Sequence, residues 1–186
     1  MFRKMRRIRQ ELPLDRVEEV LRRGTNGVLA VQGDDGYPYA VPLSYVYHNS
    51  KLYFHSAKAG HKVDAIRRQP KVSFAVVDED TVVSAEYTTY FRSVIAFGRA
   101  FVVEDAAERR DAFLALTAKY SADQPREKQE AEVGGCTQAI LRQRGHRIRQ
   151  GQPNQIKPIG GKERHHGTVL AQKCGDPHHG RRFYPL

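Results

Sequence analysis

The chain has 186 residues, two cysteines and a formal net charge of +10. This length is sufficient for one ordinary domain, or for one domain and a tail. No stretch approaches the roughly 18 consecutive apolar residues of a membrane helix, and no apolar signal core follows the basic start MFRKMRRIRQ. Two cysteines are too few for a scaffold held together by disulfides. We therefore expect a cytoplasmic protein with reduced thiols.

The positive charge is concentrated in the last third of the chain. Residues 1–130 contain 21 Lys and Arg against 18 Asp and Glu, a net charge of +3. Residues 131–186 contain 10 basic and 3 acidic residues, a net charge of +7. A protein that binds nucleic acid through its charge would therefore use mainly this tail, which contains no recognisable nucleic-acid-binding motif.

The first third of the chain alternates between helical and strand patterns. The stretch 14–23, LDRVEEVLRR, predicts an amphipathic helix between Pro13 and Gly24. GVLAV (27–31) predicts a short strand, and the turn signal GDDG follows it. Two prolines interrupt the next strand-like run, YPYAVPLSYVY (37–47). Because proline cannot donate to a ladder, we expect a bulge there, or nitrogens that face something other than a neighbouring strand.

The middle of the chain continues with strands around one short helix. Three further strands are predicted over 52–56, 71–78 and 88–105. HKVDAIRRQ (61–69) predicts a helix that Pro70 ends. DEDTVVSAEY (78–87) predicts an acidic loop.

A second amphipathic helix is predicted over 106–120, after which the chain becomes polar. About five strands with helices between them imply an α+β fold built on a small antiparallel barrel. AIL (139–141) and TVLA (168–171) are the strand-sized apolar patches that follow. We therefore predict a folded domain over 1–125 and a poorly ordered basic tail over 126–186.

The densest local chemistry is the pattern Ser56-x-Lys58-x-Gly60-His61-Lys62 at a strand-to-helix junction. A helix N-terminus presents free N–H groups and a partial positive charge, so it attracts anions. Ser56 can donate a hydroxyl hydrogen bond, and Gly60 permits close approach of the backbone. Lys58 and Lys62 add charge. The combination suits a phosphate monoester, although a solvated basic turn is the commoner explanation and the Walker spacing is absent.

Three other residues stand out by their place in a strand. His55 ends one strand, where alternation puts it on the face opposite Phe54, and such a histidine is more often structural than catalytic. Arg92 and Ser93 interrupt an otherwise apolar strand. The arginine requires a partner such as a carboxylate, a ligand phosphate or a neighbouring subunit, unless it simply faces an edge.

We expect no metal site. The tail pairs His165-His166 and His178-His179 match no structural zinc spacing. The acidic run 78–80 is better explained as a solvated loop, because nothing near it supplies the geometry of a metal site.

Several motifs, taken in order, resemble one protein family over residues 1–125. These are GTNGVLAV, GDDGYPYAVPLSYVY, LYFHSAKAGHKVDAIRRQPKVSF, VVDED and TTYFRSVIAFGRA. They are similar to the pyridoxamine 5′-phosphate oxidase-like FMN-binding split barrels, and most of all to the nitroimidazole-resistance (Nim) branch. The resemblance implies an antiparallel split β-barrel with flanking helices that works as a homodimer and binds FMN at the interface.

The resemblance also implies which residues contact the cofactor. It places the FMN phosphate at the basic turn, made of Ser56, Lys58, Gly60, His61 and Lys62. It places the isoalloxazine ring along the proline-containing strand, at Pro42, Leu43, Ser44 and Tyr45. It adds contacts from a neighbouring subunit through Arg92 and Ser93. The histidine of FHSA, here His55, would face the ring and the substrate, and we predict it to be catalytic, as a proton donor or substrate-orienting group.

The implied activity is the FMN-dependent reduction of nitroimidazole-type or related small acceptors by an external electron donor. The alternatives are an FMN-binding sensor or carrier without turnover, a pyridoxamine phosphate oxidase-like activity, and nucleic-acid binding through the tail. The chain departs from the family where a further strand is expected, because CTQAILRQRGHRIRQG has Arg, Gln and Gly where core side chains are needed. The sequence therefore predicts a lost strand and an exposed barrel edge.

Overall fold

The computed structural model describes residues 10–135 and 139–151. Its strands are β1 (Asn26–Gln32), β2 (Pro38–Ser44), β3 (Val46–His48), β4 (Lys51–Ser56), β5 (Lys71–Val83), β6 (Thr88–Val102) and β7 (Ala139–Gly151). Its helices are α1 (Leu14–Arg23), α2 (His61–Arg68), α3 (Ala106–Tyr120) and α4 (Arg126–Gly135). Two short 3-10 turns, η2 (Asp34–Gly36) and η3 (Ser84–Glu86), connect β1 to β2 and β5 to β6.

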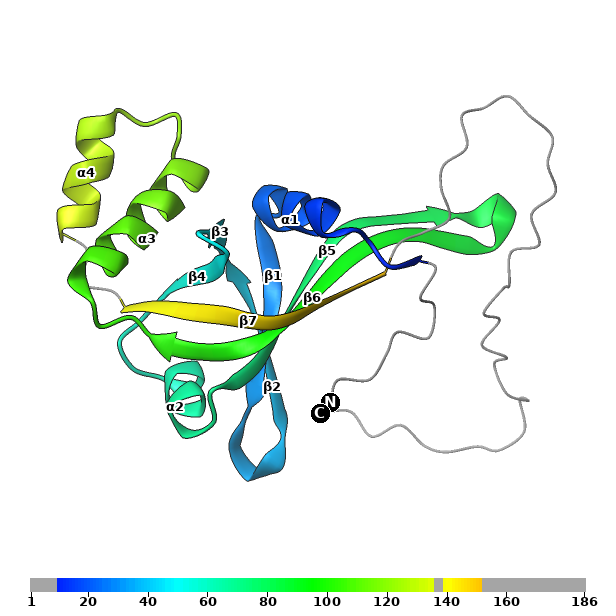
Figure 1. The fold of residues 1–186 in the computed structure, drawn as a ribbon, viewed down its shortest axis with the longest axis horizontal. Coiled ribbons are helices and arrows are strands. Elements are labelled where there is room, and N and C mark those ends of the chain that lie inside the picture. Colours follow the sequence, from blue (N-terminus) through cyan, green and yellow to red (C-terminus); the bar gives the residue numbers. More distant parts are fainter. Residues whose placement is uncertain (1–9, 136–138, 152–186) are drawn as a thin grey trace, which may run out of the picture.

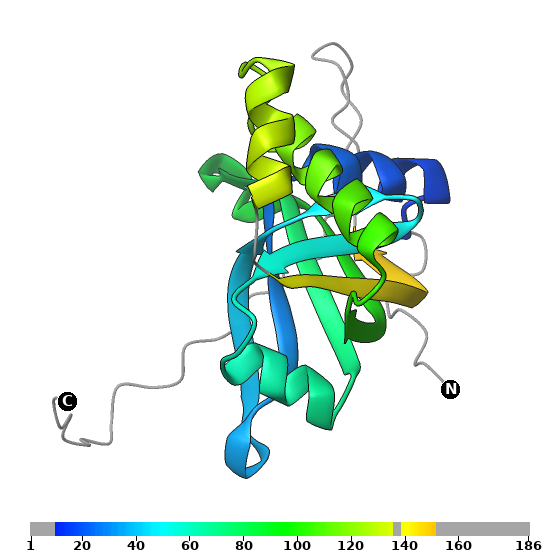
Figure 2. The same cartoon turned by 90° about the vertical axis from the view of Figure 1, so that its left-hand side faces the viewer.

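All seven strands join one antiparallel sheet in the order β2-β1-β5-β6-β7-β4-β3 (Figure 1). Helices α3 and α4 lie together beside β3, β4 and β7, while α1 and α2 lie at opposite ends of the curled sheet (Figure 2). The fold is therefore an α+β split barrel with flanking helices, as predicted. Across the described residues, no helix combines the length and the apolar character needed to cross a bilayer.

The barrel interior forms because alternate strand residues point inward. Leu29, Phe54 and Phe74 are fully buried, one on each of three strands. Phe74 contacts the rings of Phe54 and Tyr45, each at a centroid distance of 4.9 Å. A second apolar cluster lies outside the barrel, where α3 and α4 cover β4 and β7. Its buried members are Val46, Tyr53, Val103, Ala112, Phe113, Leu116, Val133 and Ile140.

Strand β7 corrects the prediction of a lost strand, because it lies inside the sheet between β6 and β4. Ile140 and Leu141 are both fully buried and fill the core on the two faces. Gln143, where a core side chain was expected, is also buried, and its Nε2 donates to the carbonyl of Ala96 at 2.8 Å. Arg142 and Gln143 are accepted here because each donates a hydrogen bond to a neighbouring group. The boundary that we predicted at residue 125 thus falls between two helices of a fold that continues to residue 151, and the rest of the predicted tail, 152–186, lies outside the described residues.

The acidic loop predicted over 78–87 is also corrected. Strand β5 continues to Val83 and pairs with β6, and the register shifts at Asp78. The pairing persists because β-branched Val82 and Val83 lie opposite threonines, which suit a pleated surface. The two strands project beyond the rest of the sheet as a long hairpin (Figure 1).

The prolines of the interrupted strand lie on an edge of the sheet. Strand β2 pairs with β1 on one side only, with Pro42 opposite Val28 and Pro38 opposite Gln32. Pro38 and Pro42 are four residues apart, so their nitrogens point to the same side of the strand. Proline is tolerated in a strand where its nitrogen faces away from the neighbouring strand. The strand is therefore continuous through both prolines up to Ser44, and the backbone breaks only at Tyr45, before β3.

Candidate functional site

The basic turn between β4 and α2 has the geometry of an anion site. Gly60 stands immediately before the helix with φ 121°, a conformation that favours glycine, and no side chain caps the first turn of α2. The first N–H groups of the helix therefore remain available to an anion. Lys58 is exposed and Lys62 is half-buried, and neither forms an ion pair with the described residues.

Ser56 is the buried member of this turn. Its side chain is 3% exposed, and its Oγ has no hydrogen-bond partner among the described residues. A buried hydroxyl without a partner costs about 1–3 kcal/mol, and native structures rarely leave one in that state. An anion at the end of β4 would provide the missing acceptor, so the residues present fit a phosphate.

His61 is held by the β1–β2 hairpin. Its ring stacks on Tyr39 at a centroid distance of 4.1 Å, and its Nε2 lies 3.4 Å from the Asp34 carboxylate. Arg68 donates to the same carboxylate at 3.0 Å and to the carbonyl of Gly33 at 3.2 Å. The acidic GDDG turn and the basic helix α2 thus bind each other. The sequence analysis did not predict this pairing, although the opposite charges of the two segments were a signal for it. A role for His61 in phosphate binding stays a prediction.

The residues predicted to line the flavin ring do not share one face of β2. Pro42 and Ser44 are exposed and point outward. Leu43 points inward and packs against the barrel core, and Tyr45 is fully buried in that core. Only the outward pair and the backbone between them can form a wall for a flat ring. The exposed proline and serine are small enough to let such a ring approach closely.

Tyr45 marks the break between β2 and β3, and the end of α3 fixes it there. The hydroxyl of Tyr120 accepts a hydrogen bond from the Tyr45 N–H at 2.9 Å and lies within donating distance of the carbonyls of Tyr45 and Thr25. Lys119 donates to the carbonyl of Gly24 at 2.5 Å, and its ammonium lies 4.4 Å from the Tyr45 ring centroid. Burial lowers the pKa of Lys119 and raises that of the Tyr45 hydroxyl. The path of the candidate ring strand thus depends on contacts from 75 residues away in sequence.

His55 lies on the outward face of β4, exposed and opposite the direction of Phe54, as predicted. Its ladder partner on β7 is Ile140. On the same face of β4 and β7, Glu108 of α3 accepts hydrogen bonds from Lys51, Tyr53 and Arg142, at 2.9, 2.7 and 2.6 Å. The bonds from Arg142 and then Lys51 lower the pKa of Glu108 to about 2. This group of charges fixes α3 to β4 and β7, and the sequence alone did not reveal it.

Arg92 forms ion pairs with the carboxylates of Asp78 and Glu79. Of the partners considered for this arginine, the structure therefore contains a carboxylate. Asp78 also pairs with Arg23 and is 5% exposed, which corrects the prediction of a solvated acidic run. Burial alone would raise the pKa of Asp78, but the bonds from both arginines outweigh it and lower this pKa.

Arg92 and Ser93 lie far from the basic turn within one chain. Ser93 pairs with Val77 in the hairpin region, whereas Val102, at the other end of β6, shares its row with Phe54 through β7. Nine residues of strand separate Ser93 from Val102, which corresponds to about 30 Å along β6. The structure therefore brings the turn and His55 together but not these two residues.

No group of three or more potential ligand residues that could hold a metal ion occurs among residues 10–135 and 139–144, whose side chains are described. The histidine pairs considered above belong to the part of the tail that lies outside the described residues.

Comparisons with known proteins agree with this fold. A family model described as pyridoxamine 5′-phosphate oxidase matches residues 13–148. Comparison with curated proteins gives no match.

Among solved structures, a proposed 5-nitroimidazole antibiotic resistance protein of Bacteroides thetaiotaomicron is 22% identical, with a TM-score of 0.63 over 75% of this chain and 84% of the other. A conserved hypothetical protein of Mycobacterium tuberculosis is 21% identical, with a TM-score of 0.69 over 85% and 98%. An FAD-binding protein of Mesorhizobium loti is 23% identical, with a TM-score of 0.58 over 77% and 97%. At these identities the structures show a shared fold.

Proposed function

We propose that this chain, which belongs to the pyridoxamine 5′-phosphate oxidase family, is a flavin-dependent oxidoreductase that holds its flavin phosphate at the turn from Ser56 to Lys62. The buried Ser56 hydroxyl without a partner carries this proposal, because a phosphate oxygen would accept its hydrogen bond. Lys58 and Lys62 supply the compensating charge. A flavin supplies hydride or electron transfer when bound, and the protein supplies orientation and electrostatics.

FMN is the flavin that we propose, with its ring against the outward side of β2. A terminal phosphate monoester matches the single turn, and the exposed side chains of Pro42 and Ser44 form the wall for the ring. A proline there has no N–H to leave unpaired under the ring. The FAD-binding protein of Mesorhizobium loti shares this fold, which supports a flavin of either kind.

We assign the reaction as reduction of small nitroaromatic acceptors such as nitroimidazoles. The Bacteroides thetaiotaomicron protein of the same fold carries that description, which supports the choice. Reduction of a nitro group to an amine takes up protons as well as electrons and releases water, so a proton donor beside the acceptor is needed. His55 is exposed on the outward face close to the turn, and a histidine can donate near neutral pH.

A second copy of the chain is proposed to complete the site by covering the apolar part of the outward face of the sheet. Pro42, Val28, Ala75 and Ile95 form one continuous row across β2, β1, β5 and β6. Val28 and Ile95 are 39% and 38% exposed, which is unusual for a row of apolar residues on a sheet. Ile95→Lys is expected to give a monomer with an unchanged far-UV circular dichroism spectrum. If light scattering still showed a dimer, this face would not be the interface.

The bound flavin is tested by the absorbance of the purified full-length protein near ~450 nm and by identifying the flavin released on denaturation. Ser56→Ala is expected to leave folding intact and to weaken flavin binding about tenfold, because one charge-assisted hydrogen bond is lost. Lys128→Ala changes an exposed cation on α4 and is the matched control. A colourless wild-type protein that takes up no added flavin would overturn the proposal.

Turnover is tested by NAD(P)H-driven reduction of a 5-nitroimidazole. His55→Ala is expected to keep the flavin and to lower the rate about 10²-fold or more, the usual contribution of a general acid. His48→Ala is the control, since that histidine pairs with Asp111 on the side covered by α3. Full activity of His55→Ala with flavin bound would show that its assigned role is wrong. A yellow protein without any reductase activity would instead favour a sensor or carrier.

A further inference from the structure

A second set of cations lies across the outward face of the sheet, apart from the basic turn. The ladders align Lys71 of β5 with Arg99 of β6, Arg99 with Arg144 of β7, and Arg144 with Lys51 of β4. Four neighbouring strands thus each place one cation in a single row, and neighbouring strands are about 4.8 Å apart. We call these four residues the basic row.

Three charges of the basic row are not neutralised within the described part of the chain. Lys51 pairs with Glu108 at 2.9 Å. Lys71, Arg99 and Arg144 are exposed, and no described carboxylate lies within ion-pair distance of them. Like charges directly opposite each other in a sheet are destabilising. An anion placed across the row would remove this repulsion.

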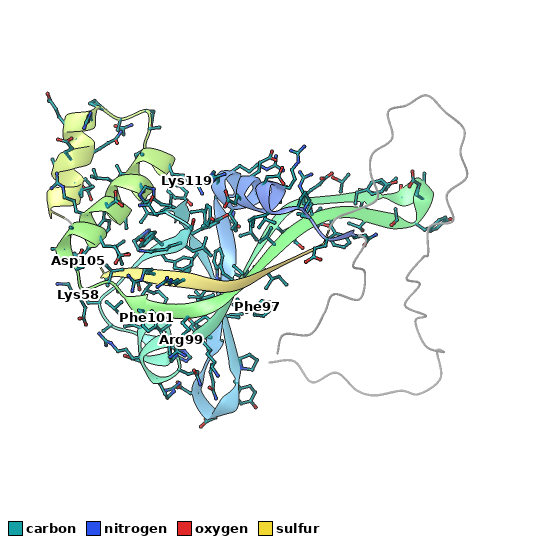
Figure 3. The ribbon with its side chains drawn as sticks, viewed as in Figure 1. Lys58, Phe97, Arg99, Phe101, Asp105 and Lys119 are labelled. Atoms are coloured by element: carbon teal, nitrogen blue, oxygen red, sulfur yellow. The ribbon has the colours of Figure 1, made fainter. Side chains whose placement is uncertain are left out.

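Aromatic residues flank the row on the same face of β6. Phe97, Arg99 and Phe101 alternate with buried residues, in steps of about 7 Å along the strand (Figure 3). The Arg99 guanidinium carbon lies 6.0 Å from the Phe101 ring centroid, and that of Arg142 lies at the same distance from it. Phe101 is 39% exposed. The surface therefore presents the Arg99 cation between the aromatic side chains of Phe97 and Phe101.

We propose that the basic row binds the diphosphate of a dinucleotide, with one ring of that ligand against Phe101. A single phosphate reaches two neighbouring cations of the row, whereas a diphosphate reaches all three of Lys71, Arg99 and Arg144. The guanidinium fork of arginine suits phosphate oxygens, and aromatic side chains stack on nucleotide rings.

The dinucleotide is the nicotinamide electron donor and not the flavin itself. Arg144 is five ladder positions from Ala139, which pairs with Ser56, so the row lies about 17 Å from the basic turn. One diphosphate cannot occupy both places, and the turn is assigned to the flavin phosphate. The intervening outward row contains Phe101 and Arg142, and the exposed Phe101 is where a ring of the dinucleotide would lie. The inference therefore rests on the proposed function for the identity of the ligand.

The test is calorimetric titration of the full-length protein, as purified, with NAD⁺, NADP⁺ and inorganic pyrophosphate. Arg99→Ala is expected to weaken binding of the dinucleotide and of pyrophosphate about tenfold, the effect of losing one charge-assisted contact. Arg99→Lys keeps the charge but not the guanidinium fork, so its affinity should lie between that of the wild type and that of Arg99→Ala. Arg110→Ala removes an exposed cation of α3 outside the row and should leave binding unchanged. Circular dichroism and the absorbance near ~450 nm should be the same in all variants.

Three results would overturn the inference: wild-type protein that binds none of the three probes, equal weakening in Arg99→Ala and Arg110→Ala, or a change in the released flavin in Arg99→Ala. Tight, salt-sensitive RNA binding that Arg99→Ala abolishes, without any dinucleotide binding, would also overturn it by assigning the row to nucleic acid. A colourless protein whose binding of pyrophosphate still depends on Arg99 would refute the flavin proposal and leave the anion site standing.

Discussion

Glu108 is the residue whose removal the structure predicts most sharply. Its carboxylate accepts from Arg142, Lys51 and Tyr53, which belong to two strands of the sheet, while its own N–H is bound by Asp105 at the start of α3. Glu108→Gln keeps the size of the side chain but leaves two cations facing a neutral amide. The substitution should therefore loosen α3 from the sheet without creating a cavity.

The expected loss is about 2 kcal/mol of unfolding free energy at pH 7. A shift of the Glu108 pKa to about 2, from an ordinary value near ~4.3, sets an upper limit of about 3 kcal/mol. The carboxylate is 20% exposed, and solvent screening reduces the effect below that limit.

The pH dependence follows from the sign of the shift. Because the pKa of Glu108 is lowered in the folded state, its contribution is complete above the unfolded pKa near ~4.3 and is lost as the pH falls toward about 2. Wild type and Glu108→Gln should therefore differ by about 2 kcal/mol at pH 7 and by less than about 1 kcal/mol at pH 3.

Urea unfolding followed by far-UV circular dichroism measures this difference at each pH. Glu104→Gln is the control, because Glu104 is exposed and forms no ion pair with the described residues. A gap between wild type and Glu108→Gln that stayed constant from pH 7 to pH 3 would refute the reasoning, since a packing defect does not titrate. So would an equal loss in Glu104→Gln.

Two further substitutions test how distant segments hold the site. Gly98→Ala should cost about 1–3 kcal/mol, because a Cβ at Gly98 would lie 2.3 Å from the carbonyl oxygen of Arg144 and force β6 and β7 apart; unfolding at the wild-type urea midpoint would count against that close approach. Tyr120→Phe should cost about 1–2 kcal/mol by leaving backbone groups at the β2–β3 break without their partner, and hydrogen exchange should speed up at Tyr45. Unchanged exchange there would show that the hydroxyl does not fix the break.

Much of the fold could be predicted because it depends on local patterns. Helix α1 has the predicted bounds, 14–23, and the strand and helix around the basic turn lie within one or two residues of expectation. The alternation that put His55 opposite Phe54 also holds. These features depend on spacing within about ten residues, which a single sequence records directly.

The parts that could not be predicted depend on partners distant in sequence. Arg142 is compatible with a central strand because Glu108, 34 residues earlier, accepts its hydrogen bond and neutralises its charge. Asp78 is buried because arginines from α1 and β6 converge on it. Read without these partners, the polar residues indicate loops and disorder, because burying an uncompensated charge is prohibitive. The sequence names the charges but not their pairing.

Strand β7 shows why its unusual composition is consistent with its central place. Leu141 and Gln143 point inward, the first into the apolar core and the second toward the carbonyl of Ala96. Arg142 and Arg144 alternate with them and point outward. The first of these arginines is neutralised by α3 and holds the fold together, whereas the second aligns with Arg99 and remains available to an anion. Both arginines are side chains that a purely apolar core strand would lack. Arg142 contributes to stability, and Arg144, two residues further on the same face, is available for binding. A strand of purely apolar residues would close the sheet equally well, but it would contribute no cation to its outward face.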